Sequence, residues 1–445
     1  MHRIAVIGSG VAGLAAARRL AEAPGQHRVT LFEAGSHFGG HANTFDLTLD
    51  GVSQGVDTGF LVFNHQTYPL LTRLFEDLKV QTVAAEMSFS VQVPMPDGRA
   101  GLEWSGTSLS GVFAQRRNLL RPRFLSMLAE IARFNRLATR LALKGDEAQL
   151  RSSIADFLAD YRFGPGFRED YLLPMLGSIW SCPTDQMLRF PVATLIRFCH
   201  NHGLLQVTER PQWYSVRGGS RQYVRRMVAG LMHDGRHGAR LRTSVLSLRR
   251  LPQGVLIETE HRLEQFDHVV LACHSDQALS LLGADATPAE RSVLGAIRYQ
   301  PNLAVLHTDS SVLPQRRAAW AAWNYERATD SGTEEAGVCL HYLLNRLQPL
   351  PWKRPVMVSL NPVRPLDERR VHARIEYSHP VFDLKAIEAQ SRVGSLQGQG
   401  RTWFCGAWCG YGFHEDGLRS GLEAADGLLQ TLASLPAKTA AECVA

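Results

Sequence analysis

Three glycines near the start of the chain have the spacing of a loop that binds a dinucleotide. Gly8, Gly10 and Gly13 form a G-x-G-x-x-G pattern between an apolar stretch typical of a strand and a helical run. The first glycine permits a tight turn, the second lets a pyrophosphate approach the backbone, and the third lets helix and strand pack closely. Glu33 follows at 33 − 13 = 20 residues, where an acid accepts hydrogen bonds from a ribose. The pattern predicts dinucleotide binding.

A second glycine-rich loop precedes a predicted helix near the other end of the chain. The segment CGYGFHEDGL, residues 409–418, leads into leucines and alanines at helical spacing up to Leu429. The first turn of a helix offers unpaired backbone N–H groups and a positive dipole end, which suit an anionic or electron-rich group. The chain therefore offers such a helix end twice.

The segment directly after the second predicted strand decides between NAD and FAD. This segment, EAGSHFGGHANTF at residues 33–45, carries Gly39 and Gly40 in a further glycine loop. An NAD-binding domain has no need of a phosphate loop at this place, whereas FAD has a longer ribityl and flavin arm to hold. The loop therefore favours FAD.

The elements that must position these loops lie in separated segments. Residues 3–35 are typical of a strand, a helix and a second strand, and residues 243–273 of a hairpin followed by a buried strand. Residues 72–205 are predicted to be largely helical, whereas residues 299–377 alternate like strands. We predict an α/β fold with an FAD-binding domain of residues 1–71, 206–298 and 378–445, and an inserted α+β substrate domain of residues 72–205 and 299–377.

With these motifs in this order, the chain resembles the flavin amine oxidase superfamily, which includes monoamine oxidases, protoporphyrinogen oxidases and phytoene desaturases. The resemblance covers nearly the whole chain and implies a glutathione-reductase-like FAD-binding domain. It also implies that one FAD reaches both helix ends, the first holding the pyrophosphate and the second stabilising charge on the reduced flavin. His41 stands where the family keeps arginine or lysine, and Ala407 where it keeps an acid. We expect backbone contacts to maintain FAD binding.

The resemblance assigns cofactor contacts along the entire chain. It places Val245 at the adenine, the segment with Leu61 and Val62 beside the flavin ring, and the backbone of His414 near the pyrimidine end. The residues that it implies for FAD binding are Gly8, Gly10, Val11, Ala12, Gly13, Glu33, Ala34, Gly39, Gly40, His41, Leu61, Val62, Val245, Gly406, Ala407, His414, Glu415, Asp416 and Leu418.

Four aromatic residues are candidates for a substrate channel: Trp180, Trp213, Tyr214 and Phe413. The segments around them resemble a subgroup related to the flavin region of plant cyclopropane-fatty-acid synthases. That resemblance implies that a lipid acyl chain is desaturated by hydride transfer to flavin N5. No catalytic residue is assigned, and Lys353 cannot be given the role of the lysine that amine oxidases keep near N5.

Two other functions stay open. One is the oxidation of an amine or another small substrate. The other is a flavoprotein without turnover that serves as an accessory subunit of a lipid-modifying enzyme.

Composition excludes several classes of function. Arginine supplies nearly all of the positive charge behind the net +6, and no nucleic-acid-binding module accompanies it. The sequence has no metal-binding motif, and its seven cysteines show no disulfide framework. We expect a cytoplasmic enzyme without a metal.

A predicted amphipathic helix over residues 123–144 carries arginines beside its apolar stripe. Such a helix more often packs its stripe on its own domain. The alternative is peripheral contact with an anionic membrane, at its inner face.

Overall fold

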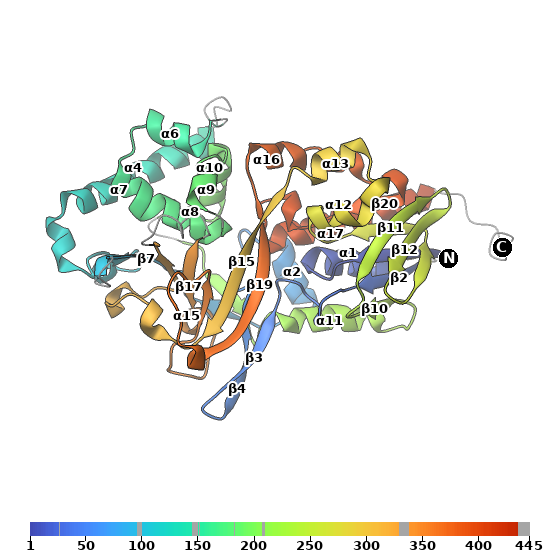
Figure 1. Ribbon diagram of the computed structural model, residues 1–445, viewed down its shortest axis with the longest axis horizontal. Helices are drawn as coiled ribbons and strands as arrows, with labels where there is room; N and C mark the ends of the chain where they lie inside the picture. The colour runs from blue at the N-terminus through green and yellow to red at the C-terminus, as the bar shows by residue number, and fades with distance from the viewer. Residues whose placement is uncertain are drawn as a thin grey trace.

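The structure is a computed structural model that describes residues 1–25, 27–95, 100–144, 150, 152–181, 183–206, 210–328 and 338–434. Two large sheets dominate it, with β2 toward the right of Figure 1 and β7 toward the left. The first sheet has five parallel strands, in the order β10 (Gly238–Arg240), β2 (His27–Phe32), β1 (His2–Ile7), β14 (His268–Leu271) and β20 (Thr402–Phe404).

Strand β1 is apolar at successive positions because both of its faces are covered. Ile4 and Val6 belong to the core that contains the apolar residues of α1 (Val11–Glu22) and α17 (His414–Ser434). Ala5 and Ile7 point to the opposite face, since side chains alternate along a strand. They belong to a second core, which includes residues of β11 (Val245–Leu251), β12 (Gly254–Thr259), β13 (Leu263–Phe266) and α12 (Ser275–Leu282).

Helices α1 and α17 pack closely because glycines lie at their contact. A Cβ on Gly421 would lie 2.2 Å from the carbonyl oxygen of Ala12, and one on Gly417 would lie 2.7 Å from Val11 Cγ1. A Cβ on Gly13 would lie 1.9 Å from the carbonyl oxygen of Gly8, the close packing of helix on strand that the motif predicts. The contacts join the first turn of α1 to the first two turns of α17, so the N-termini of the two helices lie next to each other.

Seven strands form the second large sheet. The predicted strands within residues 299–377 are confirmed there. In spatial order the sheet contains β19 (Val371–Val381), β15 (Arg298–His307), β18 (Met357–Leu360), β17 (Cys339–Leu343), β16 (Trp323–Glu326), β7 (Phe89–Pro94) and β8 (Ala100–Ser105).

The prediction that residues 72–205 are largely helical is wrong for residues 82–105, which contain three strands. Strand β7 pairs in parallel with β16 and antiparallel with β8, and β6 (Thr82–Ala85) pairs with β9 (Trp213–Val216). Partners distant in the sequence thus decide the conformation of this stretch. Helices come after it, namely α4 (Pro122–Lys144), α6 (Ile154–Asp160), α7 (Pro165–Phe167), α8 (Leu173–Trp180), α9 (Thr184–Met187) and α10 (Val192–Asn201).

The amphipathic helix predicted over residues 123–144 is α4. Its stripe is buried at Phe124, Met127, Phe134, Ala138 and Leu141, and it packs against α7 and α10. The stripe therefore serves the protein's own core. Across the described part of the chain, no helix combines the length and apolar character needed to cross a membrane.

The expected α/β class is confirmed. The domain boundaries stay a prediction, and β15 and β19 each run across one of them. The other elements near the site are β3 (Thr44–Leu49), β4 (Val52–Asp57), β5 (Phe63–Asn64), α2 (Pro69–Asp77), α11 (Arg221–Met232) and α15 (Leu344–Leu347).

The contact between α1 and α17 can be tested with Gly421→Ala. The new methyl group would overlap the Ala12 backbone, so we expect the free energy of unfolding to fall by roughly 1–3 kcal/mol or more. Gly230→Ala in α11 is the matched control, because a Cβ there meets nothing within 4 Å. The control should stabilise slightly, since alanine favours a helix. Equal urea denaturation midpoints for the two variants would contradict the proposed role of Gly421.

Candidate cofactor and substrate site

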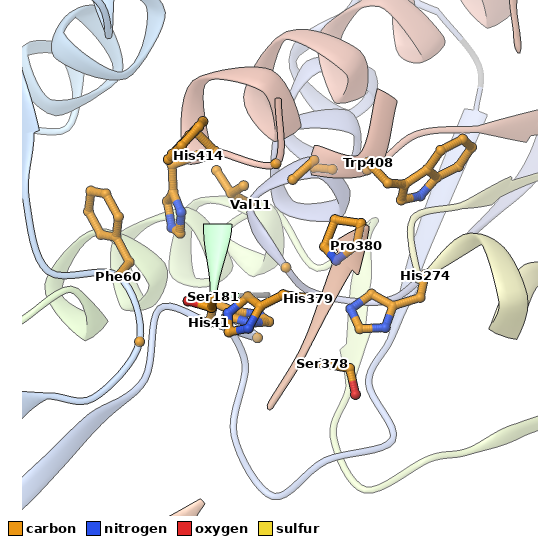
Figure 2. Close-up of a pocket in the computed structure, with 18 of the residues that line it drawn as sticks. Val11, His41, Phe60, Ser181, His274, Ser378, His379, Pro380, Trp408 and His414 are labelled. Carbon is orange, nitrogen blue, oxygen red and sulfur yellow. The ribbon is translucent and has the colours of Figure 1, made fainter. Parts of the chain in front are cut away.

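A cavity of about 870 Å³ lies between the two large sheets (Figure 2). Gly8 and Ala272, just beyond the carboxyl ends of β1 and β14, line one part of it, whereas Trp323 and Tyr342 of the second sheet line another. In open parallel sheets, ligands bind outside the carboxyl ends of the strands. The cavity is therefore where this architecture places a ligand.

The first glycine loop forms one end of the cavity. Gly10 precedes α1, and a Cβ placed on it would meet nothing within 4 Å, so its backbone is open to a ligand. No side chain caps the first turn of α1 and no acid lies in it, which leaves the positive helix end free to receive an anion. The Ser9 backbone N–H donates to Glu33 Oε2 at 3.0 Å, and this carboxylate also lines the cavity. The arrangement fits a dinucleotide pyrophosphate.

The second glycine loop presents the start of α17 to the same cavity. Figure 2 shows the His414 ring beside Phe60, and the ring centroids lie 3.8 Å apart in a stacked arrangement. His414 Nε2 also lies 3.1 Å from the Tyr223 hydroxyl. Burial lowers the pKa of His414 to about 3, so its ring is neutral near pH 7. His414 therefore adds no positive charge at the start of α17, whose first turn also contains the acids Glu415 and Asp416.

Most residues that the sequence assigns to FAD line the cavity. Four do not. The Glu415 carboxylate accepts from the backbone N–H groups of Leu70 and Leu71, at 3.0 Å each. Asp416 accepts from the N–H groups of Tyr411 and Phe413. Leu418 is in the core, and Gly13 packs against Gly8. Backbone contacts of these four positions with FAD stay a prediction. The lining residues are Gly8, Gly10, Val11, Ala12, Glu33, Ala34, Gly39, Gly40, His41, Leu61, Val62, Val245, Gly406, Ala407 and His414.

Three more histidines line the middle of the cavity. His41 stacks on Tyr377 with ring centroids 4.6 Å apart and lies 5.2 Å from His379, while His274 stacks on Tyr299. Burial lowers the pKa of His379 to about 4, and burial together with neighbouring histidines holds the pKa of His41 well below its usual range. His41 Nε2 is buried and has no hydrogen-bond partner among the described residues. A polar group of a bound cofactor would satisfy it.

The far part of the cavity is aromatic and aliphatic. Of the four aromatic candidates, Trp213 and Phe413 line it. Trp180 is buried instead between Phe190 and Phe198, with ring centroids at 5.9 and 4.8 Å. Tyr214 lies beside His65 at 4.4 Å and is outside the lining. Other residues of this part are Met87, Phe89, Trp104, Tyr171, Met175, Ile179, Phe198, His202, Leu204, Trp323 and Tyr342, together with the polar residues Ser88, Ser178 and Arg210.

Charge is nearly absent from the wall. Among the described lining residues, Glu33 is the only carboxylate and Arg210 the only lysine or arginine. Glu33 lies at the dinucleotide end, so the aromatic part has no carboxylate in its described wall. The described part of this wall therefore offers no anion to a cationic substrate.

One buried group of residues outside the cavity has the donor types of a metal site. Glu326, Cys339 and His341 place potential ligand atoms within 4.8 Å of one another. His341 Nε2 lies 2.9 Å from Glu326 Oε2, and Arg364 Nε lies 2.6 Å from Glu326 Oε1. The carboxylate is thus already paired with two side chains, which accounts for its burial without a metal.

Several lining residues were not identified from the sequence as site residues. His379 comes from β19, Met175 and Ile179 from α8, and Arg210 from the stretch before β9. No local motif marks them, because the cavity forms only where these distant elements meet.

The family described as flavin containing amine oxidoreductase matches residues 11–329. No curated protein sequence gave a match. A conjugated-linoleic-acid (CLA)-producing fatty acid isomerase from P. acnes has 18% identity and a TM-score of 0.65, covering 96% of this chain and 98% of its own. Cyclohexylamine oxidase from Brevibacterium oxydans IH-35A has 16% identity and a TM-score of 0.65, covering 97% and 99%.

Putrescine oxidase bound to putrescine is a further match, with 14% identity and a TM-score of 0.62, covering 96% of this chain and 99% of its own. At these identities the structures show a shared fold. They include proteins named for fatty acids and for amines, so the fold alone does not choose between the two substrate classes.

The role of the first loop can be tested with Gly10→Leu. The site is open and Gly10 has φ −59°, so the fold should tolerate leucine while the side chain enters the pyrophosphate position. We expect an unchanged melting temperature without FAD and a dissociation constant for FAD raised by at least about tenfold, measured by flavin fluorescence. Gly106→Leu is the control. Gly106 directly follows β8 and also lines the cavity, and a Cβ placed on it would likewise meet nothing within 4 Å. If Gly10→Leu bound FAD as wild type does, the assignment of this loop would be wrong.

Proposed function

The chain belongs to the family of flavin containing amine oxidoreductases and is an FAD-dependent oxidoreductase, and within that family we propose that it desaturates a lipid acyl chain. Bound FAD would supply the oxidation by accepting a hydride from the substrate. The residues that would hold FAD are those of the first glycine loop, Glu33, the loop with His41, and the start of α17.

The observation that carries the proposal is the chemistry of the aromatic part of the cavity. An amine substrate needs a wall that compensates its ammonium group or holds it neutral. In the described wall the aromatic part has no carboxylate, and its one full charge is the cation of Arg210. An acyl chain needs only apolar contact along its length, which Met175, Ile179 and Phe198 provide.

The packing of this wall would hold a chain in place. Phe413 stacks on Phe198 with ring centroids 5.0 Å apart, and Phe198 stacks on His202 at 3.9 Å. These rings fix one another, so the wall next to α17 is rigid. A rigid apolar wall excludes water and holds a C–H bond of the acyl chain near the N-terminal end of α17, where the flavin is expected.

Desaturation also releases a proton, and His202 is placed to accept it. His202 Nδ1 lies 3.0 Å from the carbonyl oxygen of Phe198, so Nδ1 carries the hydrogen of the neutral ring and donates it to this oxygen. Nε2 then keeps a free lone pair, and the residue lines the cavity. His202 Nε2 would take a proton from one carbon, and the electron pair of that C–H bond would form the double bond to the neighbouring carbon, whose hydride bound FAD would accept.

The substrate class can be tested under anaerobic conditions. FAD-loaded protein is mixed with unsaturated or methylated phospholipids in detergent and, separately, with primary amines and polyamines. We expect the oxidised flavin band to bleach with lipid and to persist with amines, because the wall favours an apolar chain. Bleaching by amines alone would contradict the proposal, and an unchanged band with every compound would favour an accessory flavoprotein.

The role of His202 can be tested with His202→Gln. Glutamine can still donate to the Phe198 carbonyl but cannot accept the proton as a base, so we expect the rate of flavin bleaching to fall by about 100-fold with FAD content unchanged. Burial lowers the pKa of His202 to about 4, so the wild-type rate should be level near neutral pH and fall as the pH approaches that value. A variant with the wild-type rate and pH profile would exclude His202 as the proton acceptor.

A further inference from the structure

Four leucines are exposed within a short stretch between β8 and the first turn of α4. Leu109 of α3 (Leu109–Val112) is 80% exposed, Leu119 and Leu120 of η1 (Arg116–Leu120) are 50% and 87% exposed, and Leu125 of α4 is 42% exposed. Single exposed leucines are common, but several close together mark an interaction surface. Figure 1 places α4 and β7 at the end of the molecule opposite the chain's N-terminus.

These leucines are outside a core that is already filled. Phe124 packs edge-on against Trp104 at 6.2 Å and against Phe113 at 6.1 Å, and Gly111, Gln115 and Asn118 are buried. The inner side of the segment therefore has its own packing partners. The four leucines are exposed on the outside of this packed segment.

The charge of the same segment has one sign. Between Glu103 and Glu130 the sequence contains Arg116, Arg117, Arg121 and Arg123 and no acidic residue. Arg123 is paired with Glu169 and Asp170, whereas Arg117 and Arg121 both donate to the Gly101 carbonyl, at 2.8 and 3.5 Å. Cations therefore gather beside the leucines.

A distant segment adds to this positive charge. The turn η5 (Arg317–Ala319) packs against α3 and β8, which brings Arg316 and Arg317 to the same face. Burial and the neighbouring Arg121 and Arg316 lower the pKa of Arg117, as expected where guanidinium groups lie close together. Arg316 itself pairs with Glu103, and Arg317 is exposed.

The exposed face adjoins the aromatic part of the cavity. Trp104 and Gly106, both in the cavity wall, directly precede α3 in the chain. Tyr171, another wall residue, packs on Trp104 with ring centroids 6.2 Å apart. A lipid that met the leucines would thus be close to the part of the cavity that suits an acyl chain.

We propose that this face docks the protein on an anionic phospholipid bilayer, an inference that rests on the proposed action on lipid acyl chains. The docking surface consists of Leu109, Leu119, Leu120 and Leu125 with Arg116, Arg117, Arg121, Arg316 and Arg317. The leucines enter the interface between headgroups and acyl chains, and the arginines meet lipid phosphates. Nucleic acid would use the arginines but would leave the leucines without a partner, so the bilayer fits both features.

The test is co-sedimentation of the full FAD-loaded chain with vesicles. One set contains phosphatidylcholine alone, and the other contains phosphatidylcholine and phosphatidylglycerol in equal parts. We expect binding to the anionic set to be at least about tenfold tighter, because each arginine near an anionic surface adds attraction. High salt should reduce that preference, since it screens the charges.

Variants separate the two parts of the docking surface. Leu109→Ser with Leu120→Ser should weaken binding to anionic vesicles by at least about tenfold, and both side chains are exposed enough for the fold to tolerate the change. Leu263→Ser with Leu384→Ser is the matched control, since these leucines are 62% and 50% exposed on β13 and α16 (Leu384–Gln390). The control should bind as wild type does.

Two outcomes of the vesicle experiments would overturn the docking surface. One is equal binding of wild type to both vesicle sets, and the other is wild-type binding by the Leu109 and Leu120 variant. Binding of single-stranded RNA that depends on Arg116 and Arg117 but not on the leucines would also overturn it, in favour of nucleic acid. Flavin bleaching by lipid dispersed in detergent is measured alongside. If lipid in detergent bleaches the flavin although the protein does not dock, the proposed function stays intact. If the protein docks but lipid does not bleach the flavin, the proposed function alone is refuted.

Discussion

The close contact between α1 and α17 is the constraint on which the cavity depends. These helices come from opposite ends of the chain, and the first turn of α1 touches the first two turns of α17 because Gly417 and Gly421 leave room for Val11 and Ala12. Two helix N-termini consequently lie beside one cavity. The start of α1 has no acid in its first turn, so its positive dipole end is open to the pyrophosphate of a dinucleotide. The two glycine loops serve one site.

Helix ends matter here because the cavity contains little other charge. Burial holds the pKa of His379 and of His414 far below that of a free histidine, so these rings are neutral at physiological pH. Neutral rings can pack on aromatic neighbours and still offer hydrogen bonds. The wall is therefore polar at the dinucleotide end and apolar at the substrate end. The amine oxidoreductase fold combines these two ends without a buried ion pair in the described lining.

Asp57 joins the cavity's two sides. Its carboxylate accepts from the Ser220 backbone N–H at 2.9 Å and from Gln348 Nε2 at 2.7 Å, and its own N–H donates to Gln348 Oε1. Ser220 precedes α11 and Gln348 follows α15, so one residue links elements on either side of the cavity. The segment with Phe60, Leu61 and Val62 begins two residues later and lines the wall. Burial raises the pKa of Asp57 to about 6, a sign of how fully this link is removed from water.

The sequence alone determined the features that local patterns encode. The spacing of glycines after a strand, with an acid at a fixed distance, predicted the FAD loop. An apolar period of about four residues predicted the C-terminal helix and α4, and a period of two predicted the strands of residues 299–377. Each depends on residues that are close to one another in the sequence, the longest interval being the 20 residues from Gly13 to Glu33. Tertiary structure decided the rest. The strand pairing of β7 with β16, the use of Glu415 to bind the N–H groups of Leu70 and Leu71, and the burial of Trp180 between two phenylalanines all involve partners far away in the chain. Such contacts leave no periodic signal, because either partner alone is compatible with many surroundings.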